Sequence, residues 1–252
     1  MQRPVSTGRR IVVAAARGGA GRTTLTALMG TAFATRRADP VLVVDAAPWP
    51  GSLTWRLGLV GAAPLSATAP RVMGPQGRRL ADLDGVLART PAGLWCLPGG
   101  DGEQVPVHVV RDATRALSLL CAVTVTDTGE GLGAASTGSV LSDAHAVVLA
   151  APSTPDGVVA TAASLARLGV GSPGLLSRVV VVLVELDPSA RSALRVSDAV
   201  TALASWGVAV LPLPHDRHLA AGAAVAGRRL AAATVRATHH ICAETLERAV
   251  QA

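Results

Sequence analysis

Short apolar runs alternate with longer amphipathic stretches along most of the chain. Continuous apolar runs predict buried strands at 11–16, 41–45, 94–97, 121–127, 144–150, 179–184 and 208–213. Between them, apolar residues at helical spacing predict helices at about 23–37, 107–120, 156–168, 190–206 and 231–250. Strands that are apolar throughout are typical of a parallel sheet with both faces covered. The pattern therefore predicts an α/β fold of three layers, with a mostly parallel, twisted sheet and helices on both faces.

Two stretches interrupt this alternation. Residues 60–92 are rich in Pro, Gly and Ala and show little periodicity, which predicts an irregular surface segment with one short helix near 80–87. Residues 1–9 are expected to form a loose N-terminal segment. Because no linker or internal repeat divides the chain, we expect one domain over residues 1–252.

Composition narrows the range of functions. Half of the 252 residues are hydrophobic, so the chain can bury a large core. Only 2% are aromatic, which argues against an RNA-binding module that stacks bases on aromatic side chains. The absence of Lys and Asn is typical of a high-G+C, actinobacterial genome. All 23 basic side chains are therefore Arg, and because they are scattered, the net charge of +6 indicates a solvated surface and no specific nucleic-acid partner.

Cysteine usage and hydropathy predict a cytoplasmic protein. Cys96, Cys121 and Cys242 are odd in number and far apart, so neither a disulfide framework nor a zinc site is expected. The apolar run at 11–16 is too short for a signal peptide or a membrane span. The stretch at 231–250 has an apolar stripe, but its polar side carries both signs of charge. We therefore expect it to pack on the domain and not to insert into a membrane.

A glycine-rich loop between the first strand and the first helix carries the strongest chemical signal. It consists of Arg17, Gly18, Gly19, Ala20, Gly21, Arg22, Thr23 and Thr24. Small residues let backbone N–H groups converge on a phosphate, and the helix N-terminus behind them favours negative charge. A hydroxyl directly after the basic residue, here that of Thr23, can ligate Mg²⁺. The alternative is a plain glycine-rich turn, against which the flanking strand and helix argue.

Residues 11–24 resemble the deviant Walker A motif of the ParA/MinD-like P-loop ATPases, which reads Lys-Gly-Gly-x-Gly-Lys-Thr-Thr. Three further segments are similar to family motifs: 41–48 to Asp-x-Asp-Pro, 123–129 to Walker B, and 213–216 to the Pro-x-Asp near adenine. The resemblance covers nearly the whole chain and implies a P-loop NTPase fold of the SIMIBI class. Segments 45–57, 127–132 and 215–219 look most like the MinD-like proteins associated with actinobacterial type VII secretion.

The resemblance implies roles for the matching residues. The glycine-rich loop would bind ATP or ADP, together with Pro214 and Asp216. Thr23 and Asp127 would hold Mg²⁺, and Asp45 is the candidate catalytic acid. From the residues alone, Asp45 and Asp127 can instead cap the turns that follow their strands. Asp216 can likewise be a turn residue after Pro214.

Three positions depart from the family motif. Arg22 stands where the family has its phosphate-binding Lys, and Arg17 where it has the signature Lys that reaches across a nucleotide-sandwich dimer. Arg keeps the charge, but it is a bulky planar fork, so the exchange is not conservative inside a tight loop. Ala47 replaces the second Asp of Asp-x-Asp, which in the family helps to organise the attacking water. Without that group, hydrolysis is expected to lose at least about 10²-fold.

Other kinds of site find little support in the sequence. The four histidines at 215, 218, 239 and 240, with Cys242 nearby, do not offer four converging ligands, so surface histidines are expected. No Gly-x-Ser-x-Gly elbow is present, which argues against a hydrolase triad. A dinucleotide-binding Rossmann loop would need Gly where Thr23 stands. Adenine preference stays open, because Glu185 and Asp187 lie where the family has an Asn.

These features predict a ParA/MinD-like nucleotide-binding protein with a degenerate site. It would act as a switch or scaffold linked to type VII secretion, with weak or no ATP hydrolysis. Two alternatives stay open: an active partitioning ATPase that binds DNA non-specifically, and an interaction module that has lost its nucleotide. The expected partners are a secretion-apparatus protein and a second copy of the chain, in a nucleotide-dependent homodimer to which Arg17 contributes. Arg17 can also be a merely solvated loop residue.

Overall fold

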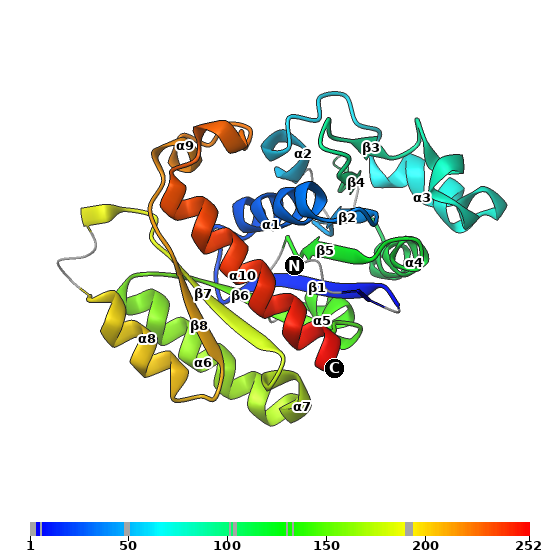
Figure 1. Cartoon of the computed structure of the whole chain (residues 1–252). Helices are drawn as coiled ribbons and strands as arrows, with labels where there is room; N and C mark the ends of the chain where they lie inside the picture. Colours follow the sequence, from blue (N-terminus) through cyan, green and yellow to red (C-terminus); the bar gives the residue numbers. More distant parts are fainter. Residues whose placement is uncertain are drawn as a thin grey trace.

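A twisted sheet forms the centre of the computed structural model, which describes residues 4–5, 7–47, 51–100, 102, 105–129, 131–132, 134–189 and 194–252 (Figure 1). Within these residues the sheet has eight strands in the order β3-β4-β2-β5-β1-β6-β7-β8. The strands are β1 (Arg9–Ala15), β2 (Val41–Asp45), β3 (Ala88–Arg89), β4 (Trp95–Leu97), β5 (Val123–Asp127), β6 (Ala146–Pro152), β7 (Val179–Val184) and β8 (Ala209–Leu213). All neighbours pair in parallel except β3 with β4, which confirms the predicted fold class.

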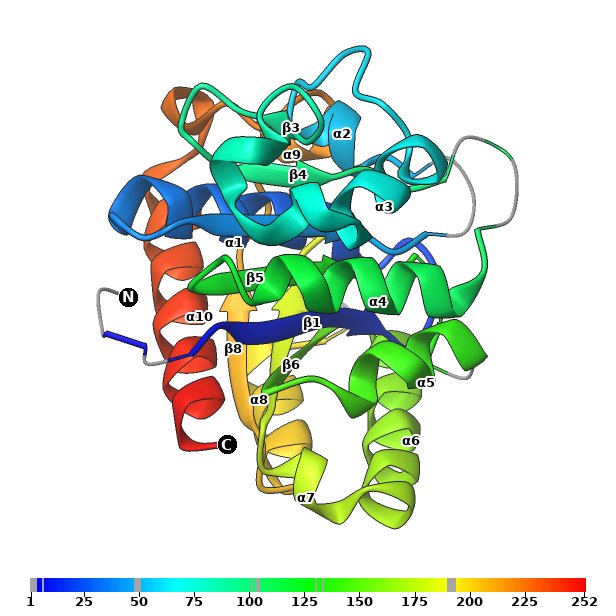
Figure 2. The same cartoon turned by 90° about the vertical axis from the view of Figure 1, so that its right-hand side faces the viewer.

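Helices cover both faces of this sheet. They are α1 (Arg22–Arg36), α2 (Leu53–Arg56), α3 (Leu65–Met73), α4 (Val107–Ser118), α5 (Ala135–Ser142), α6 (Pro155–Gly171), α7 (Pro173–Leu176), α8 (Val196–Ala204), α9 (Arg217–Ala220) and α10 (Ala232–Gln251), with the 3₁₀ helices η1 (Pro75–Arg78), η2 (Leu80–Leu83) and η4 (Gly227–Arg229). Helices α1 and α10 pack on one face, and α3, α4, α5, α6 and α8 pack on the other (Figure 2).

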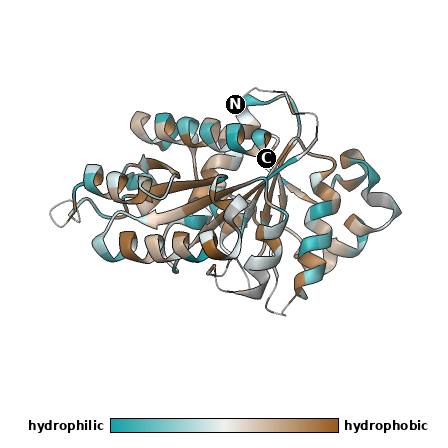
Figure 3. Ribbon diagram, turned by 90° about the horizontal axis from the view of Figure 1, so that it is seen from below, coloured by the Kyte–Doolittle hydropathy of each residue, from teal (hydrophilic) through white to brown (hydrophobic). Residues whose placement is uncertain are grey.

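The alternation of side chains along the strands explains these two layers. In β1, Ile11 and Val13 pack against α1 and α10, whereas Val12 and Ala14 pack against α5, α6 and α8. Successive residues of a strand point to opposite faces, so a strand covered on both sides must be apolar throughout. Figure 3 shows the result, with apolar strands in brown between helices of mixed colour.

Strand register brings the predicted acids to one edge of the sheet. Asp45 at the end of β2 is the register partner of Asp127 at the end of β5. Asp127 also pairs with Val13 of β1, two residues before that strand ends. The glycine-rich loop leaves β1 at this same edge. In open parallel sheets, ligands bind at the carboxyl ends of the strands.

Residues 60–92 are more regular than expected. Helix α3 lies within them and buries Leu65, Ala69 and Val72, which are spaced for one helical face. The expectation of an irregular segment was wrong because Pro70 lies inside the helix, where it removes a backbone donor and masks the periodicity.

Two predicted helices have different bounds in the structure. The short helix expected near 80–87 is the 3₁₀ helix η2, which ends at Leu83. The helix expected at 190–206 is α8, which begins at Val196, while residues 190–193 lie outside the described residues. Residues 1–3 and 6 of the segment expected to be loose also lie outside them, and β1 begins at Arg9.

The last helix packs on the domain, as its pattern predicted. Ile241, Cys242 and Leu246 of α10 are buried in the cluster formed by α1 and the sheet. Across the described ranges, no helix combines the length and the apolar character needed to cross a bilayer.

Candidate functional site

The glycine-rich loop connects the end of β1 to the start of α1. Gly19 and Gly21 have φ angles of 75° and 87°, a conformation that residues with a side chain rarely adopt. A Cβ atom added at Gly18 or Gly19 would meet no atom within 4 Å, so the loop borders open space there. At Gly21, a Cβ atom would lie 3.3 Å from Cγ1 of Val184. Gly21 is therefore required by both conformation and packing, whereas Gly18 only borders open space.

Helix α1 begins without a side-chain cap. Gly21 is its N-cap residue, and no acidic residue lies in the first turn. The N–H groups of a first helical turn lack partners within the helix. Together with the positive end of the helix dipole, they favour an anion at this point. The local geometry is the one that a phosphate cradle requires.

Arg22 contacts the segment that follows β5. Its guanidinium donates to the carbonyl oxygen of Gly129 at 2.8 Å and to Oγ1 of Thr128 at 3.2 Å. A planar guanidinium can reach two acceptors at once, in contrast to the compact ammonium of Lys. Arg22 thereby ties the first turn of α1 to the end of β5.

Arg17 forms an ion pair within its own chain. Its Nη1 contacts Oδ2 of Asp156 in the first turn of α6. Oδ1 of Asp156 accepts from Oγ1 of Thr154 at 2.6 Å. The hydrogen bonds from Thr154 and Arg17 lower the pKa of Asp156, so this carboxylate stays charged. The side chains of Arg17 and Asp156 are 46% and 61% exposed, and an ion pair in water is weak enough to exchange for another partner.

Two carboxyl groups lie buried side by side where β2 and β5 end. Asp45 and Asp127 are each 2% exposed. Burial, and secondarily repulsion from Asp127, raise the pKa of Asp45 to about 7, although the N–H of Ala47 donates to Asp45 Oδ1 at 3.1 Å. Burial also raises the pKa of Asp127, against a hydrogen bond from Thr23. A positive charge placed between these groups would stabilise both carboxylates.

The ligand chemistry around Asp127 fits a magnesium ion. Oδ1 of Asp127 is buried and has no hydrogen-bond partner among the described residues. The hydroxyl of Thr23 bonds to the same carboxylate. Mg²⁺ prefers oxygen ligands and is commonly held by one or two carboxylates together with nucleotide phosphates and water. Thr23 and Asp127 would thus hold Mg²⁺ in the way that the motif predicts.

Glycines enclose the carboxyl group of Asp45. A Cβ atom at Gly51 would fall 1.9 Å from Oδ2 of Asp45, and one at Gly99 would fall 3.1 Å from its Cγ. Beside it, Ala47 packs against Gly129, where a Cβ atom would lie 2.4 Å from the Cα of Ala47. The methyl group of Ala47 offers no acceptor for a water molecule, so this part of the site lacks the group that the family uses to position one.

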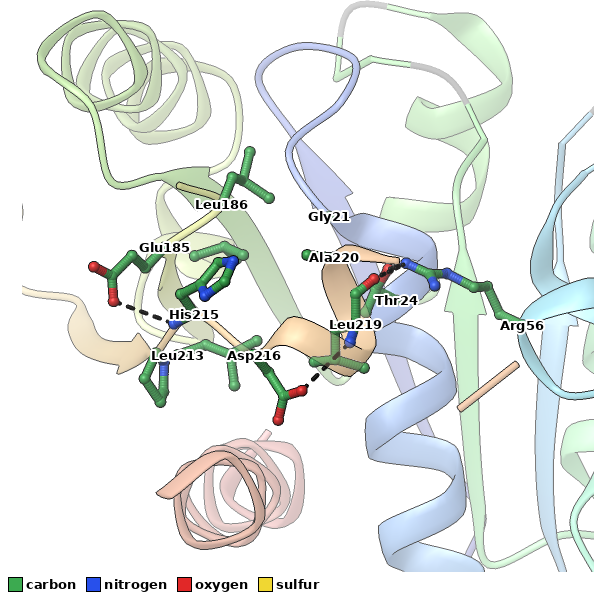
Figure 4. Close-up of a pocket in the computed structure, with 12 residues that line it drawn as sticks. Gly21, Thr24, Arg56, Glu185, Leu186, Leu213, His215, Asp216, Leu219 and Ala220 are labelled. Atoms are coloured by element: carbon green, nitrogen blue, oxygen red, sulfur yellow. Dashed lines mark hydrogen bonds between the residues drawn. The ribbon is translucent and has the colours of Figure 1, made fainter. Parts of the chain in front are cut away.

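A pocket lies between the loop and the ends of β7 and β8 (Figure 4). It is lined by Gly21, Thr24, Arg56, Val184, Glu185, Leu186, Leu213, Pro214, His215, Asp216, Leu219 and Ala220. Pro214 and Asp216, predicted to bind the nucleotide, therefore face the same space as the end of the loop. Asp216 also has a structural role: it accepts from the N–H groups of His218 and Ala231, both at 2.9 Å, and caps α9.

Two pocket residues had no predicted role in binding. In the sequence, Glu185 stands out only because it lies where the family has an Asn, and here its Oε2 accepts from the N–H of His215 at 3.1 Å. Arg56 belongs to no predicted binding motif; it ends α2 and reaches Thr24 of the loop, with 2.5 Å between Nη2 and Oγ1. Nothing in the spacing of Arg56 marks it, because the contact depends on how α2 returns to α1.

Comparison with known proteins finds similarity both in sequence and in structure. No protein-family model matches the chain. The ESX-1 secretion-associated protein EspI, from two strains of Mycobacterium tuberculosis, is 30% identical over 228 residues. The match covers 84% of this chain and 32% of EspI, so the chain spans about a third of the length of these relatives.

Similar solved structures include ParA and MinD proteins. A ParA family ATPase from Chlorobium tepidum superimposes with a TM-score of 0.76 and 17% identity, covering 94% of this chain and 99% of that one. MinD from Pyrococcus furiosus has a TM-score of 0.69 and 20% identity, with coverages of 95% and 99%. MinD from Pyrococcus horikoshii, complexed with Mg-ADP, has a TM-score of 0.68 and 17% identity, covering 94% of this chain and 95% of that one. These similarities establish the fold and confirm the resemblance stated from the motifs.

Proposed function

We propose that this chain, which has the fold of the ParA/MinD P-loop ATPases, is a nucleotide-binding protein that acts as a switch or scaffold linked to type VII secretion. In this proposal the glycine-rich loop binds ATP or ADP, and Thr23 and Asp127 hold the Mg²⁺ that accompanies the phosphates. Magnesium supplies charge neutralisation at the phosphates when it is bound. The two states of the switch are the nucleotide-bound and the nucleotide-free protein, and ATP is hydrolysed slowly or not at all.

The observation that carries the proposal is the unpartnered oxygen of Asp127 beside an uncapped helix. A buried carboxylate oxygen without a hydrogen bond is costly unless a ligand satisfies it. The same edge of the sheet carries the N-terminus of α1, which favours an anion. A nucleotide with Mg²⁺ satisfies both requirements at once, whereas a plain turn explains neither.

Two features support slow hydrolysis. Ala47 has no side-chain acceptor to orient a water molecule. The guanidinium of Arg22 is bonded to Thr128 and Gly129 at the end of β5. A guanidinium held there cannot move to stabilise the negative charge that develops on the phosphates in the transition state of hydrolysis. The site is therefore suited to binding more than to turnover.

The link to type VII secretion rests on similarity to EspI, which is named as an ESX-1 secretion-associated protein. Because the match spans about a third of EspI, it concerns only the part of EspI that aligns with this chain. MinD of Aquifex aeolicus has been solved in complex with MinC, so a protein of this fold can present a surface to a partner. We infer a partner in the secretion apparatus on this basis.

Calorimetric titration with ATP and ADP, each with and without Mg²⁺, tests the proposal. We expect binding that strengthens with Mg²⁺ and loses this Mg²⁺ dependence in Asp127→Asn. The matched control is Asp112→Asn, which removes a carboxylate that pairs with Arg111 at the surface of α4. If the parent binds neither nucleotide, the proposed function is wrong.

The second candidate is an interaction module without nucleotide. It is favoured by the intrachain partners of both loop arginines, Asp156 for Arg17 and the end of β5 for Arg22. Such a module would retain the loop as a structural turn. The same titration separates the two candidates, because the module would bind neither ATP nor ADP.

A further inference from the structure

Arg56 joins three elements around the candidate site. Its Nη2 donates to Oγ1 of Thr24 at 2.5 Å and to the carbonyl oxygen of Leu219 at 3.1 Å, and its Nη1 donates to the carbonyl oxygen of Ala223 at 2.9 Å. The carbonyl oxygen of Arg56 accepts from the N–H of Val225 at 2.7 Å. One side chain at the end of α2 therefore contacts α1, α9 and the segment after α9. Figure 4 shows Arg56 directed towards Thr24 and Leu219.

Arg56 also lines the pocket, together with Gly21 and Thr24. A guanidinium has five N–H donors, and three are used by the acceptors above. Arg56 is half-buried, and burial lowers its pKa from the usual value without removing its charge at neutral pH. It therefore brings a positive charge to the pocket, and two of its donors have no acceptor among the described residues.

Neither arginine of the loop lines this pocket. Arg17 is paired with Asp156, and Arg22 is bonded to the end of β5. The pocket carboxylates are also engaged, since Glu185 and Asp216 accept from backbone N–H groups. An anion in this pocket would therefore meet the guanidinium of Arg56, to which no carboxylate is bonded among the described residues.

We propose that Arg56 is a further nucleotide-binding residue, whose guanidinium contacts a phosphate of the bound nucleotide on the Thr24 side of the loop. The inference rests on the proposed function and goes beyond the loop motif. Arg17 and Arg22 are bonded to other parts of the protein. In this proposal Arg56, from α2, supplies part of the positive charge that the phosphates require. The same hydrogen bonds couple the occupied site to α9, because the carbonyl oxygens of Leu219 and Ala223 share the guanidinium with the ligand.

Calorimetric titrations of ATP, ADP and adenosine into the parent, Arg56→Gln and Arg56→Lys test this role. A charged hydrogen bond to phosphate predicts that Arg56→Gln binds ATP and ADP about tenfold more weakly or worse. Affinity for adenosine, which has no phosphate, should be unchanged. Arg56→Lys should recover part of the loss, because it keeps the charge but not the fork. Arg228→Gln in η4 is the control, since it removes one exposed arginine outside the pocket.

The outcomes separate the inference from the function on which it rests. If the parent binds no nucleotide, the proposed function fails and the role of Arg56 fails with it. If the parent binds and Arg56→Gln binds ATP equally well, or loses ATP and adenosine in the same proportion, Arg56 only braces α2 and the inference alone is wrong. Should Arg56→Gln not fold, Arg56→Lys decides: a loss confined to the phosphate-bearing ligands supports the contact, and unchanged affinity refutes it.

Discussion

Alanine at Gly18 and at Gly21 should separate the structural from the functional demands on the glycine-rich loop. Gly18 does not have a positive φ, and a Cβ atom there would meet nothing within 4 Å. Gly21 has a φ of 87°, and its Cβ atom would press against Val184 at 3.3 Å. The two changes add the same methyl group to the same loop, so each serves as the control for the other.

The expected magnitudes differ in stability and in binding. Forcing a residue with a Cβ atom into the left-handed region costs about 1–2 kcal/mol, so Gly21→Ala should lower the free energy of unfolding by at least that much. For a chain of this size, each kcal/mol lowers Tm by about 2–4 °C. Gly18→Ala should leave Tm unchanged or raise it slightly, because alanine restricts the unfolded chain. A methyl group in the phosphate space should nevertheless weaken ATP binding about tenfold, at the low end of the overpacking range of ~1–3 kcal/mol.

Thermal unfolding followed by circular dichroism, and calorimetric titration with Mg-ATP, measure the two quantities. The informative variant is Gly18→Ala, with unchanged Tm and weakened binding. Suppose that the parent binds Mg-ATP and that Gly18→Ala binds it equally tightly. The open space beside Gly18 then does not hold the phosphates, and the loop is a structural turn. If Gly21→Ala is as stable as the parent, position 21 does not require the left-handed conformation.

Three further predictions follow from the same structure. In a phosphate-release assay, the rate of ATP hydrolysis should stay well below the ordinary enzymatic value of about 1 s⁻¹. The triple change Arg17→Lys, Arg22→Lys, Ala47→Asp should raise this rate. A parent protein that hydrolyses ATP at about 1 s⁻¹ or faster would contradict the role inferred for Ala47. Arg17→Ala should weaken nucleotide-dependent dimerisation in sedimentation more than it weakens nucleotide binding, and a chain that stays monomeric with saturating Mg-ATP would refute the expected dimer to which Arg17 contributes. Burial, and secondarily the nearby charge of Arg10, lower the pKa of His145 to about 4 from 6.5. Protonation therefore favours the unfolded chain, so His145 contributes stability above pH 6.5 that is lost as pH falls towards 4. After a discount for its partial exposure we expect about 1–2 kcal/mol, and His145→Asn should flatten the fall in Tm over this window relative to the parent.

The fold could be predicted because the strands are apolar on both faces. The run at 41–45 matches β2 in full, and 179–184 matches β7. Their β-branched residues leave no polar face that a surface helix would need. The missed elements are of a different kind. In helix α3, Pro70 masks the periodicity, and α9 is a four-residue helix capped by Asp216, which is too short for a periodic signal.

The loop geometry could be anticipated from the sequence, but the partners of its arginines could not. A glycine at position 21 and a hydroxyl at position 23 have local meanings that spacing alone conveys. The contacts of Arg17 with Asp156 and of Arg56 with Thr24 join residues 139 and 32 positions apart. Such contacts depend on how α6 and α2 return to the sheet edge, and a charged side chain of this length can reach several alternatives.

The three arginines around the loop, Arg17, Arg22 and Arg56, each bond to a different part of the fold. Arg22 fastens the first turn of α1 to the residues after Asp127, and Arg56 fastens Thr24 to α9. Each uses several donors in fixed directions, which a lysine at the same place could not do. A phosphate bound in the loop would share these guanidinium groups with the protein acceptors, so we expect its binding to alter the contacts to the end of β5 or to α9. On the proposed function, the exchange of Lys for Arg removes a mobile point charge suited to hydrolysis, and the hydrogen bonds of these arginines connect an occupied site to two neighbouring surfaces.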